Sequence, residues 1–169
     1  EFKEEYQNKV LSNARAFAKH LADNGLAVEG DAADGYTHTH QVVIRVAEHG
    51  EGSEIADRLQ ENNIIVNYQA LPDDETFLAS SGIRTGVSEM TRYGMDEDDF
   101  GQLAEFMARV IVKNENIADE VADFRRKYTV MRYTLPLHKR ISLAAEAMES
   151  AFPTGEYAKL FADNLRKLT

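Results

Sequence analysis

The sequence contains no cysteine, so neither a disulfide framework nor a thiolate metal site can form. No apolar run is long enough to cross a bilayer, and no signal-peptide pattern opens the chain. We therefore expect a cytoplasmic protein without a membrane partner. Basic side chains are also scarce, with 19 Lys and Arg against 29 Asp and Glu and a net charge of −10. Nucleic-acid binding rests on basic side chains that neutralise phosphates, so this balance argues against such a partner. A small anionic ligand needs only one local positive site.

The 169 residues, 43% of them hydrophobic, suffice for a compact domain with a real core. We find no internal repeat and no low-complexity segment, and no linker rich in Pro, Gly or Ser divides the chain. Acidic residues gather at 73–75 and 96–99. We expect them to be solvated loop and helix-start residues, because acidic side chains are favoured near a helix N-terminus.

One stretch, residues 80–95, carries a charge inside an apolar pattern. Ile83, Thr85 and Val87 alternate and have β-branched side chains, which predicts a half-buried strand. Arg84 lies in the middle of this strand, between two glycines that leave room for a close neighbour. A buried guanidinium without a partner is very costly, so we expect Arg84 to meet an anion. Its planar fork matches a carboxylate or a phosphate.

Two kinds of anion are compatible with this pattern. One is an internal carboxylate, such as Glu89, which would make Arg84 a structural ion pair. The other is a ligand, which would make Arg84 a binding residue. The residues alone leave both interpretations open.

The remaining periodicities predict an α+β fold. Apolar residues at helical spacing indicate helices over 2–24, 54–61 with Ser53 as its cap, 96–111, 116–127, 139–149 and 156–168. Short apolar runs indicate strands over 26–28, 41–46, 64–66 and 83–87. We expect a small, mostly antiparallel sheet of three or four strands, covered on one face by helices.

The motifs of the chain resemble those of serine hydroxymethyltransferases (glycine hydroxymethyltransferases), which are pyridoxal phosphate enzymes of the aspartate aminotransferase fold type. The resemblance rests on Ser-Gly-Ile-Arg-x-Gly at 81–86 and Met-Thr-Arg-x-Gly-Met at 90–95, with Tyr-Gln-x-x-Val at 6–10 in the first helix. It implies the small C-terminal domain of a fold-type I enzyme. It also implies that Arg84 binds the α-carboxylate of a small amino-acid substrate.

Further roles follow from the same resemblance. It implies positions on the folate side or in the pocket for three residues, Asn67, Gln69 and Ser81. It implies structural support from three others, His40, Thr91 and Arg92.

The sequence departs from the family pattern in one patch. Tyr68 and Gln69 replace a Lys-Asn pair, and residues 75–78 stand where relatives have Ser-Pro-Phe. Tetrahydrofolate use is therefore open, whereas amino-acid binding is untouched.

The sequence predicts no metal site. His38 and His40 could face one ion from an extended segment, but no third ligand follows at a matching spacing, and no His-Glu-x-x-His pattern occurs. We expect both to be ordinary side chains.

The Schiff-base lysine of such enzymes is not evident in this chain. In the family it follows a Thr-rich run upstream of the small domain, whereas His138-Lys139 lies on the other side of the Arg84 motif. We interpret that pair as a coincidence. We expect residues 1–127 to form the small domain and 128–169 a helical extension packed on it. The large pyridoxal phosphate domain would precede it in a homodimeric enzyme, and this chain alone would be inactive.

Three functions remain open at this point. The first is hydroxymethyl transfer between serine and glycine, in one-carbon metabolism. The second is a folate-independent aldolase or transaldolase reaction. The third is a stand-alone binding or assembly module that kept the fold without the chemistry, with Arg84 paired to an internal carboxylate.

Overall fold

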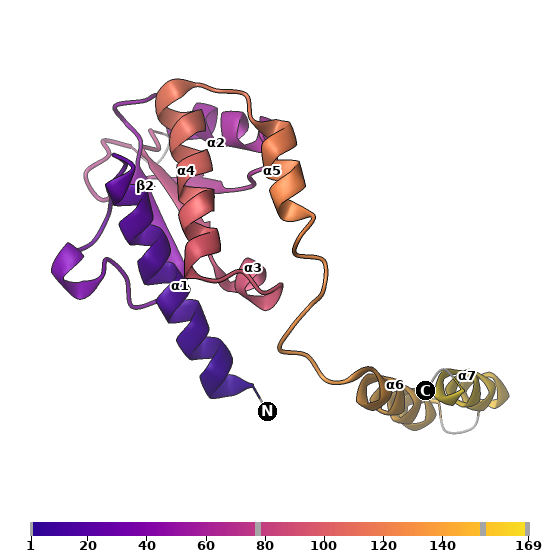
Figure 1. Ribbon diagram of the computed structural model, residues 1–169. Coiled ribbons are helices and arrows are strands. Elements are labelled where there is room, and N and C mark those ends of the chain that lie inside the picture. Colours follow the sequence, from indigo (N-terminus) through magenta and orange to yellow (C-terminus); the bar gives the residue numbers. More distant parts are fainter. Residues whose placement is uncertain (1, 77–78, 153–154, 168–169) are drawn as a thin grey trace. The chain divides into compact units, whose positions relative to one another are not determined.

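The computed structural model describes residues 2–76, 79–152 and 155–167. The chain divides into two compact units, 1–132 and 133–169 (Figure 1). Phe77 and Leu78, in the segment that replaces Ser-Pro-Phe, lie outside the described residues, as does Leu168.

The first unit contains the sheet and most of the helices. Its helices are α1 (Lys3–Asp23), the 3-10 helix η1 (Ala32–Asp34), α2 (Gly52–Glu61), α3 (Ser88–Arg92), α4 (Glu97–Lys113) and α5 (Ala118–Arg125). Its strands are β1 (Ala27–Val28), β2 (Gln41–Arg45), β3 (Asn67–Gln69) and β4 (Gly82–Gly86). The second unit consists of α6 (Leu137–Ala151) and α7 (Glu156–Arg166).

The four strands form one antiparallel sheet in the order β1-β2-β4-β3. Strand β4, which carries Arg84, therefore has a partner on each side. The predicted α+β class, with a small antiparallel sheet under helices, is confirmed.

One face of the sheet is covered by helices. Val42, Ile44 and Ile83 point into a core that they share with the buried sides of α1, α2 and α4. Helices α1 and α4 pack against each other along this face (Figure 1). Phe17 of α1 and Phe100 of α4 meet with ring centroids 5.4 Å apart. This packing buries the apolar stripes that the sequence pattern predicts.

Local signals explain the ends of two helices. Asp96 and Asp99 form a reciprocal capping box at the start of α4, with each side chain accepting the other residue's backbone N–H. Helix α1 ends at Asp23, and Gly25 follows with φ +85°, a conformation that glycine adopts without strain.

Several sequence-based expectations about element boundaries were wrong. The strand expected at 64–66 lies at Asn67–Gln69, because Asn63 turns the chain at φ 63° and Ile64 fills the core. Helix α2 begins at Gly52, before the expected Ser53 cap, and no side chain caps it. The turn after β4 contains a short helix, α3, that the pattern did not reveal.

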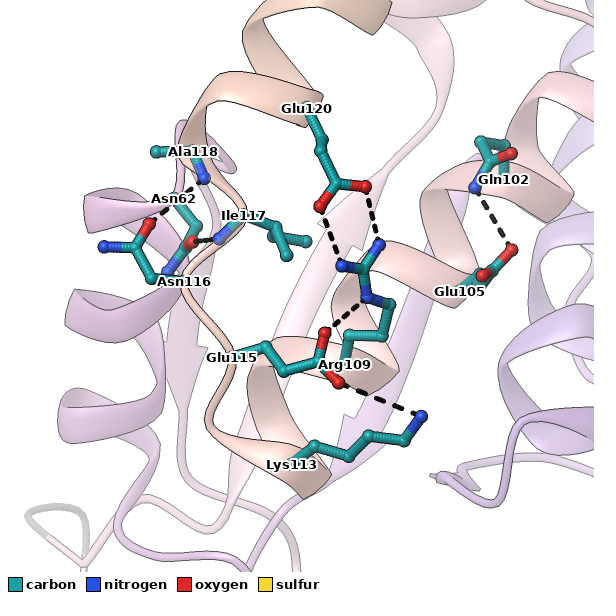
Figure 2. A network of polar contacts seen from close by, with 10 residues as sticks. All are labelled: Asn62, Gln102, Glu105, Arg109, Lys113, Glu115, Asn116, Ile117, Ala118 and Glu120. Carbon is teal, nitrogen blue, oxygen red and sulfur yellow. Dashed lines mark hydrogen bonds and ion pairs between the residues drawn. The ribbon is translucent and has the colours of Figure 1, made fainter.

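Helix α5 begins at Ala118 rather than at residue 116. Polar contacts join the start of α5 to the residues around the ends of α2 and α4 (Figure 2). The Ile117 N–H donates to Oδ1 of Asn62 at 2.6 Å, and the Ala118 N–H donates to Oδ1 of Asn116 at 3.3 Å. Arg109 of α4 reaches across to Glu115 and Glu120.

The first unit extends past the boundary expected at residue 127. Tyr128 is buried, and the Arg132 N–H donates to the Arg92 carbonyl at 2.7 Å. The predicted packing of the C-terminal extension on the domain stays a prediction.

In the second unit, α6 and α7 pack on each other and bury Ile141, Ala145 and Ala162. Helix α6 begins two residues before its expected start. Within the described ranges of both units, every helix is too short or too polar to cross a membrane.

Candidate functional site

Arg84 occupies the central position of β4, the inner strand between β2 and β3. Its Cα pairs with Val43 on one side and with Asn67 on the other. Neighbouring residues of a strand point to opposite faces, so Arg84 faces away from the core that Ile83 and Thr85 enter. The side chain is half-buried on the open face, which the helices do not cover.

The guanidinium of Arg84 has no hydrogen-bond or ion-pair partner within residues 2–76, 79–152 and 155–167. Its pairing with Glu89, the feature expected of a stand-alone module, is not formed: Glu89 lies in α3 with its side chain exposed. The five donors of Arg84 are therefore available to an anion from outside the described chain.

The residues expected on the pocket side gather around Arg84. Asn67 lies directly opposite it on β3, and Gln69 lies opposite Gly82. Tyr68, between them, points to the other face and is 56% exposed. Residues opposite each other in an antiparallel pair lie close enough to contact one ligand together. The register therefore places Arg84, Asn67 and Gln69 on one surface.

Ser81 precedes β4 by one residue. Its backbone N–H donates to Oδ2 of Asp74 at 2.9 Å, and its carbonyl accepts the Val46 N–H at 2.8 Å. Its hydroxyl oxygen is buried, and the hydroxyl lies beside the Asp74 carboxyl, whose pKa it helps to lower. Ser81 thus joins the start of β4 to the preceding loop.

Of the three residues expected to give structural support, His40 precedes β2, and Thr91 and Arg92 lie in α3, which follows β4. The His40 carbonyl accepts the Val87 N–H at 3.1 Å, just beyond β4. The Thr91 hydroxyl oxygen accepts a hydrogen bond from the side chain of Asn13, a fully buried residue of α1, at 2.8 Å. Arg92 contributes its backbone carbonyl, which binds the Arg132 N–H.

No three His, Asp or Glu side chains of the described residues lie close enough together to hold a metal ion. His38 instead contacts Arg15, whose Nη2 lies 3.2 Å from its Nδ1.

Sequence reasoning missed an arginine fork on the same open face. Arg45 ends β2 directly opposite Gly82 and donates from Nη1 and Nη2 to the two carboxylate oxygens of Asp73, at 2.9 Å each. Its Nε donates to Glu29 at 3.0 Å. Hydrogen bonds from Arg45 hold the pKa of the Asp73 carboxyl below its usual value. Asp73 is a solvated loop residue as expected, with 66% of its side chain exposed, but its pairing with Arg45 was not expected. Only the charge of Arg45 at the end of an apolar run hinted at this pairing.

Comparison with known proteins decides the family. The family model described as "Serine hydroxymethyltransferase" matches residues 1–107. This chain belongs to the serine hydroxymethyltransferase family. The serine hydroxymethyltransferase of Pyrobaculum arsenaticum is 42% identical over 142 residues, which are 83% of this chain and 33% of that protein. The one from Staphylothermus marinus is 44% identical over 137 residues, 78% of this chain and 31% of that protein. The chain thus spans about a third of the length of these serine hydroxymethyltransferases.

A solved structure extends the likeness beyond the residues that the family model matches. The L-threonine transaldolase of Pseudomonas fluorescens, in its internal aldimine state, aligns with a TM-score of 0.71 and 27% identity. The alignment covers 94% of this chain and 35% of that chain. The fold is therefore that of a segment of a pyridoxal phosphate enzyme, as the serine hydroxymethyltransferase motifs predict.

Proposed function

We propose that this chain is the substrate-carboxylate half of a pyridoxal phosphate-dependent enzyme of the serine hydroxymethyltransferase type. Arg84 binds the α-carboxylate of a small amino acid, such as serine or glycine. The observation that supports this role is its position: a guanidinium in the middle of an inner strand, on the open face, without a partner among the described residues. Asn67 and Gln69 lie beside it and offer amide groups to the same ligand.

Arg84 contributes orientation. Two parallel hydrogen bonds from a guanidinium fix both the position and the plane of a carboxylate. The bonds at the substrate's α-carbon then have a defined direction relative to the rest of the active site. Such positioning supplies a large part of the rate of many enzymes.

The strands of the open face offer no amine for a Schiff base with the cofactor. Pyridoxal phosphate requires a lysine amine, and none of the four strands contains a lysine. Lys139, the one that imitates the family's His-Lys pair, lies on α6 in the second unit. The cofactor would be bound mainly by a large domain of the same polypeptide, in a homodimeric cytoplasmic enzyme, and this chain alone would be inactive.

A folate-independent aldolase or transaldolase reaction is the second candidate. The structural alignment with an L-threonine transaldolase reaches into the second unit, since it covers 94% of the chain. The residues at 68 and 69 also differ from the family pattern on the strand next to Arg84. Tetrahydrofolate use distinguishes the two candidates: serine turnover that depends on tetrahydrofolate supports the first, and aldehyde exchange without it supports the second.

Substitution of Arg84 tests the proposal in the full-length protein. Arg84→Ala removes the charged fork, and we expect the dissociation constant for the amino acid to rise by about thirtyfold or more. Arg84→Lys keeps the charge without the fork and should recover only part of this loss. Binding is measured by the absorbance change of the bound cofactor when serine or glycine is added. An unchanged dissociation constant in Arg84→Ala would show that Arg84 has no part in substrate binding.

A further inference from the structure

The open face of the sheet holds a second ordered feature beside Arg84, the loop of residues 70–76. Asp74 closes this loop, because its Oδ2 accepts the backbone N–H of Leu71 at 2.7 Å and that of Ser81 at 2.9 Å. The Asp74 N–H donates in turn to the Leu71 carbonyl at 3.0 Å. These bonds bring Leu71 back to the start of β4.

Leu71 covers part of the face on which Arg84 lies. Its side chain is 6% exposed, and a Cβ at Gly82 would stand 2.8 Å from its Cδ2. Leu71 therefore fills the space in which a side chain at position 82 would lie. Gly82 and Arg84 are two residues apart on one strand and share a face, so Leu71 lies on the same face of β4 as Arg84, over the position two residues before it.

Arg45 fastens this loop to the sheet. It stands opposite Gly82 on β2, and its bidentate pair with Asp73 joins two segments that are 28 residues apart in the sequence. Its third bond runs to Glu29, which follows β1. The Nη atoms of Arg45 thus hold the 70–76 loop through Asp73, and its Nε holds the end of the edge strand β1 through Glu29.

We propose that Arg45 is a positioning residue for substrate binding: through Asp73 it keeps Leu71 seated over Gly82, as an apolar wall beside Arg84. This inference rests on the proposed role of Arg84. A wall on one side of the guanidinium excludes water there, and an ion pair is stronger where water is excluded. Loosening the loop weakens carboxylate binding and leaves the bond-breaking groups unaffected.

Arg45→Met in the full-length protein tests the proposal. We expect the dissociation constant of the amino acid to rise roughly three- to tenfold while kcat stays within twofold, as for a residue that acts through another. Asp73→Asn should reproduce this change, because it releases only the loop. Glu29→Gln weakens only the contact between Arg45 and the end of β1, and it should leave the dissociation constant within about twofold.

Arg109 offers a matched control. Its Nε donates to Glu115 at 2.7 Å and its two Nη atoms donate to Glu120 at 2.8 Å, a fork of the same kind that joins α4 to α5 and to the segment between them (Figure 2). Arg109→Met should leave amino-acid binding unchanged. Equal changes in Arg45→Met and Arg109→Met, or no change in either, would overturn the inference.

Amide hydrogen exchange supplies a second readout that does not depend on activity. In Arg45→Met and in Asp73→Asn, the amides of Leu71 and Ser81 should lose protection, whereas amides in β2 should keep it. Full protection of the loop amides would contradict the role of Arg45 even if binding changed. Arg84→Ala separates this inference from the proposed function, since a variant that binds amino acids normally would refute the function itself.

Discussion

The two faces of the four-stranded sheet differ in how their side chains are satisfied. On the covered face, Val42, Ile44 and Ile83 are at most 2% exposed, and the buried polar side chain of Thr85 donates to the Val42 carbonyl at 3.0 Å. On the open face, Arg45 is held by two carboxylates, whereas Arg84 has no partner within the described chain. The covered face thus supplies stability, and the open face carries the charge of Arg84, which we propose binds a ligand.

The largest effect on stability should come from the covered face. Ile83→Ala empties a fully buried site on β4, and we expect it to lower the free energy of unfolding by about 2–5 kcal/mol. Arg84→Ala, one residue along the strand, should change it by less than about 1 kcal/mol, because no internal bond is lost. Urea unfolding followed by circular dichroism measures both. A loss in Arg84→Ala as large as that in Ile83→Ala would reveal an internal partner for Arg84 and remove the contrast between the faces.

The glycines on either side of Arg84 allow a second test, in which the expected loss of stability is smaller and differs between the two positions. A Cβ at Gly82 would meet Leu71 at 2.8 Å and the Gln69 carbonyl at 3.0 Å, so Gly82→Ala should cost roughly 1–3 kcal/mol. At Gly86 the nearest atom would be His40 Cδ2 at 3.5 Å, an ordinary contact, and Gly86→Ala should be within about 1 kcal/mol of the parent. Thermal unfolding of the two variants checks this. Equal stability would mean that Leu71 does not rest against Gly82.

Local patterns predicted the features that depend on local chemistry. Alternating β-branched residues located β4, and Asp96 marked the start of α4. The short apolar run at 64–66 led to a wrong position for β3. The residues that pair with β4 are the polar ones that follow this run, Asn67–Gln69. Pairing with β4 decides that register, and no periodicity of the segment itself shows it.

The residues of the candidate site also fall into those that the local sequence predicts and those that depend on long-range pairing. Arg84 was evident because a charge in an apolar strand is conspicuous in the sequence. The fork of Arg45 was not, because Asp73 lies 28 residues away and an acidic loop residue normally faces water. The pairing arises only when the return of the chain through β4 brings the 70–76 loop beside the end of β2. Contacts of this kind follow from topology, and the single-residue pattern carries no signal for them.

The smallest effect should come from the outer edge of the helical layer, where α1 meets the first turn of α4. Hydrogen bonds from Lys9 and from Ser12, the latter at 2.7 Å, lower the pKa of Glu97 to about 2. A carboxyl with a depressed pKa stabilises the fold above its unfolded value near 4.5, and this contribution is lost as the pH falls toward 2. Because 42% of the Glu97 side chain is exposed, we expect Glu97→Gln to cost no more than about 1 kcal/mol at pH 7. The stabilities of the parent and the variant should converge below pH 4.5, as acid titrations of both would show. A difference that stays constant down to pH 2 would mean that the charge of Glu97 contributes nothing. A cost at pH 7 as large as that of Ile83→Ala would place an essential ion pair at the surface and contradict the view that the buried face carries the stability.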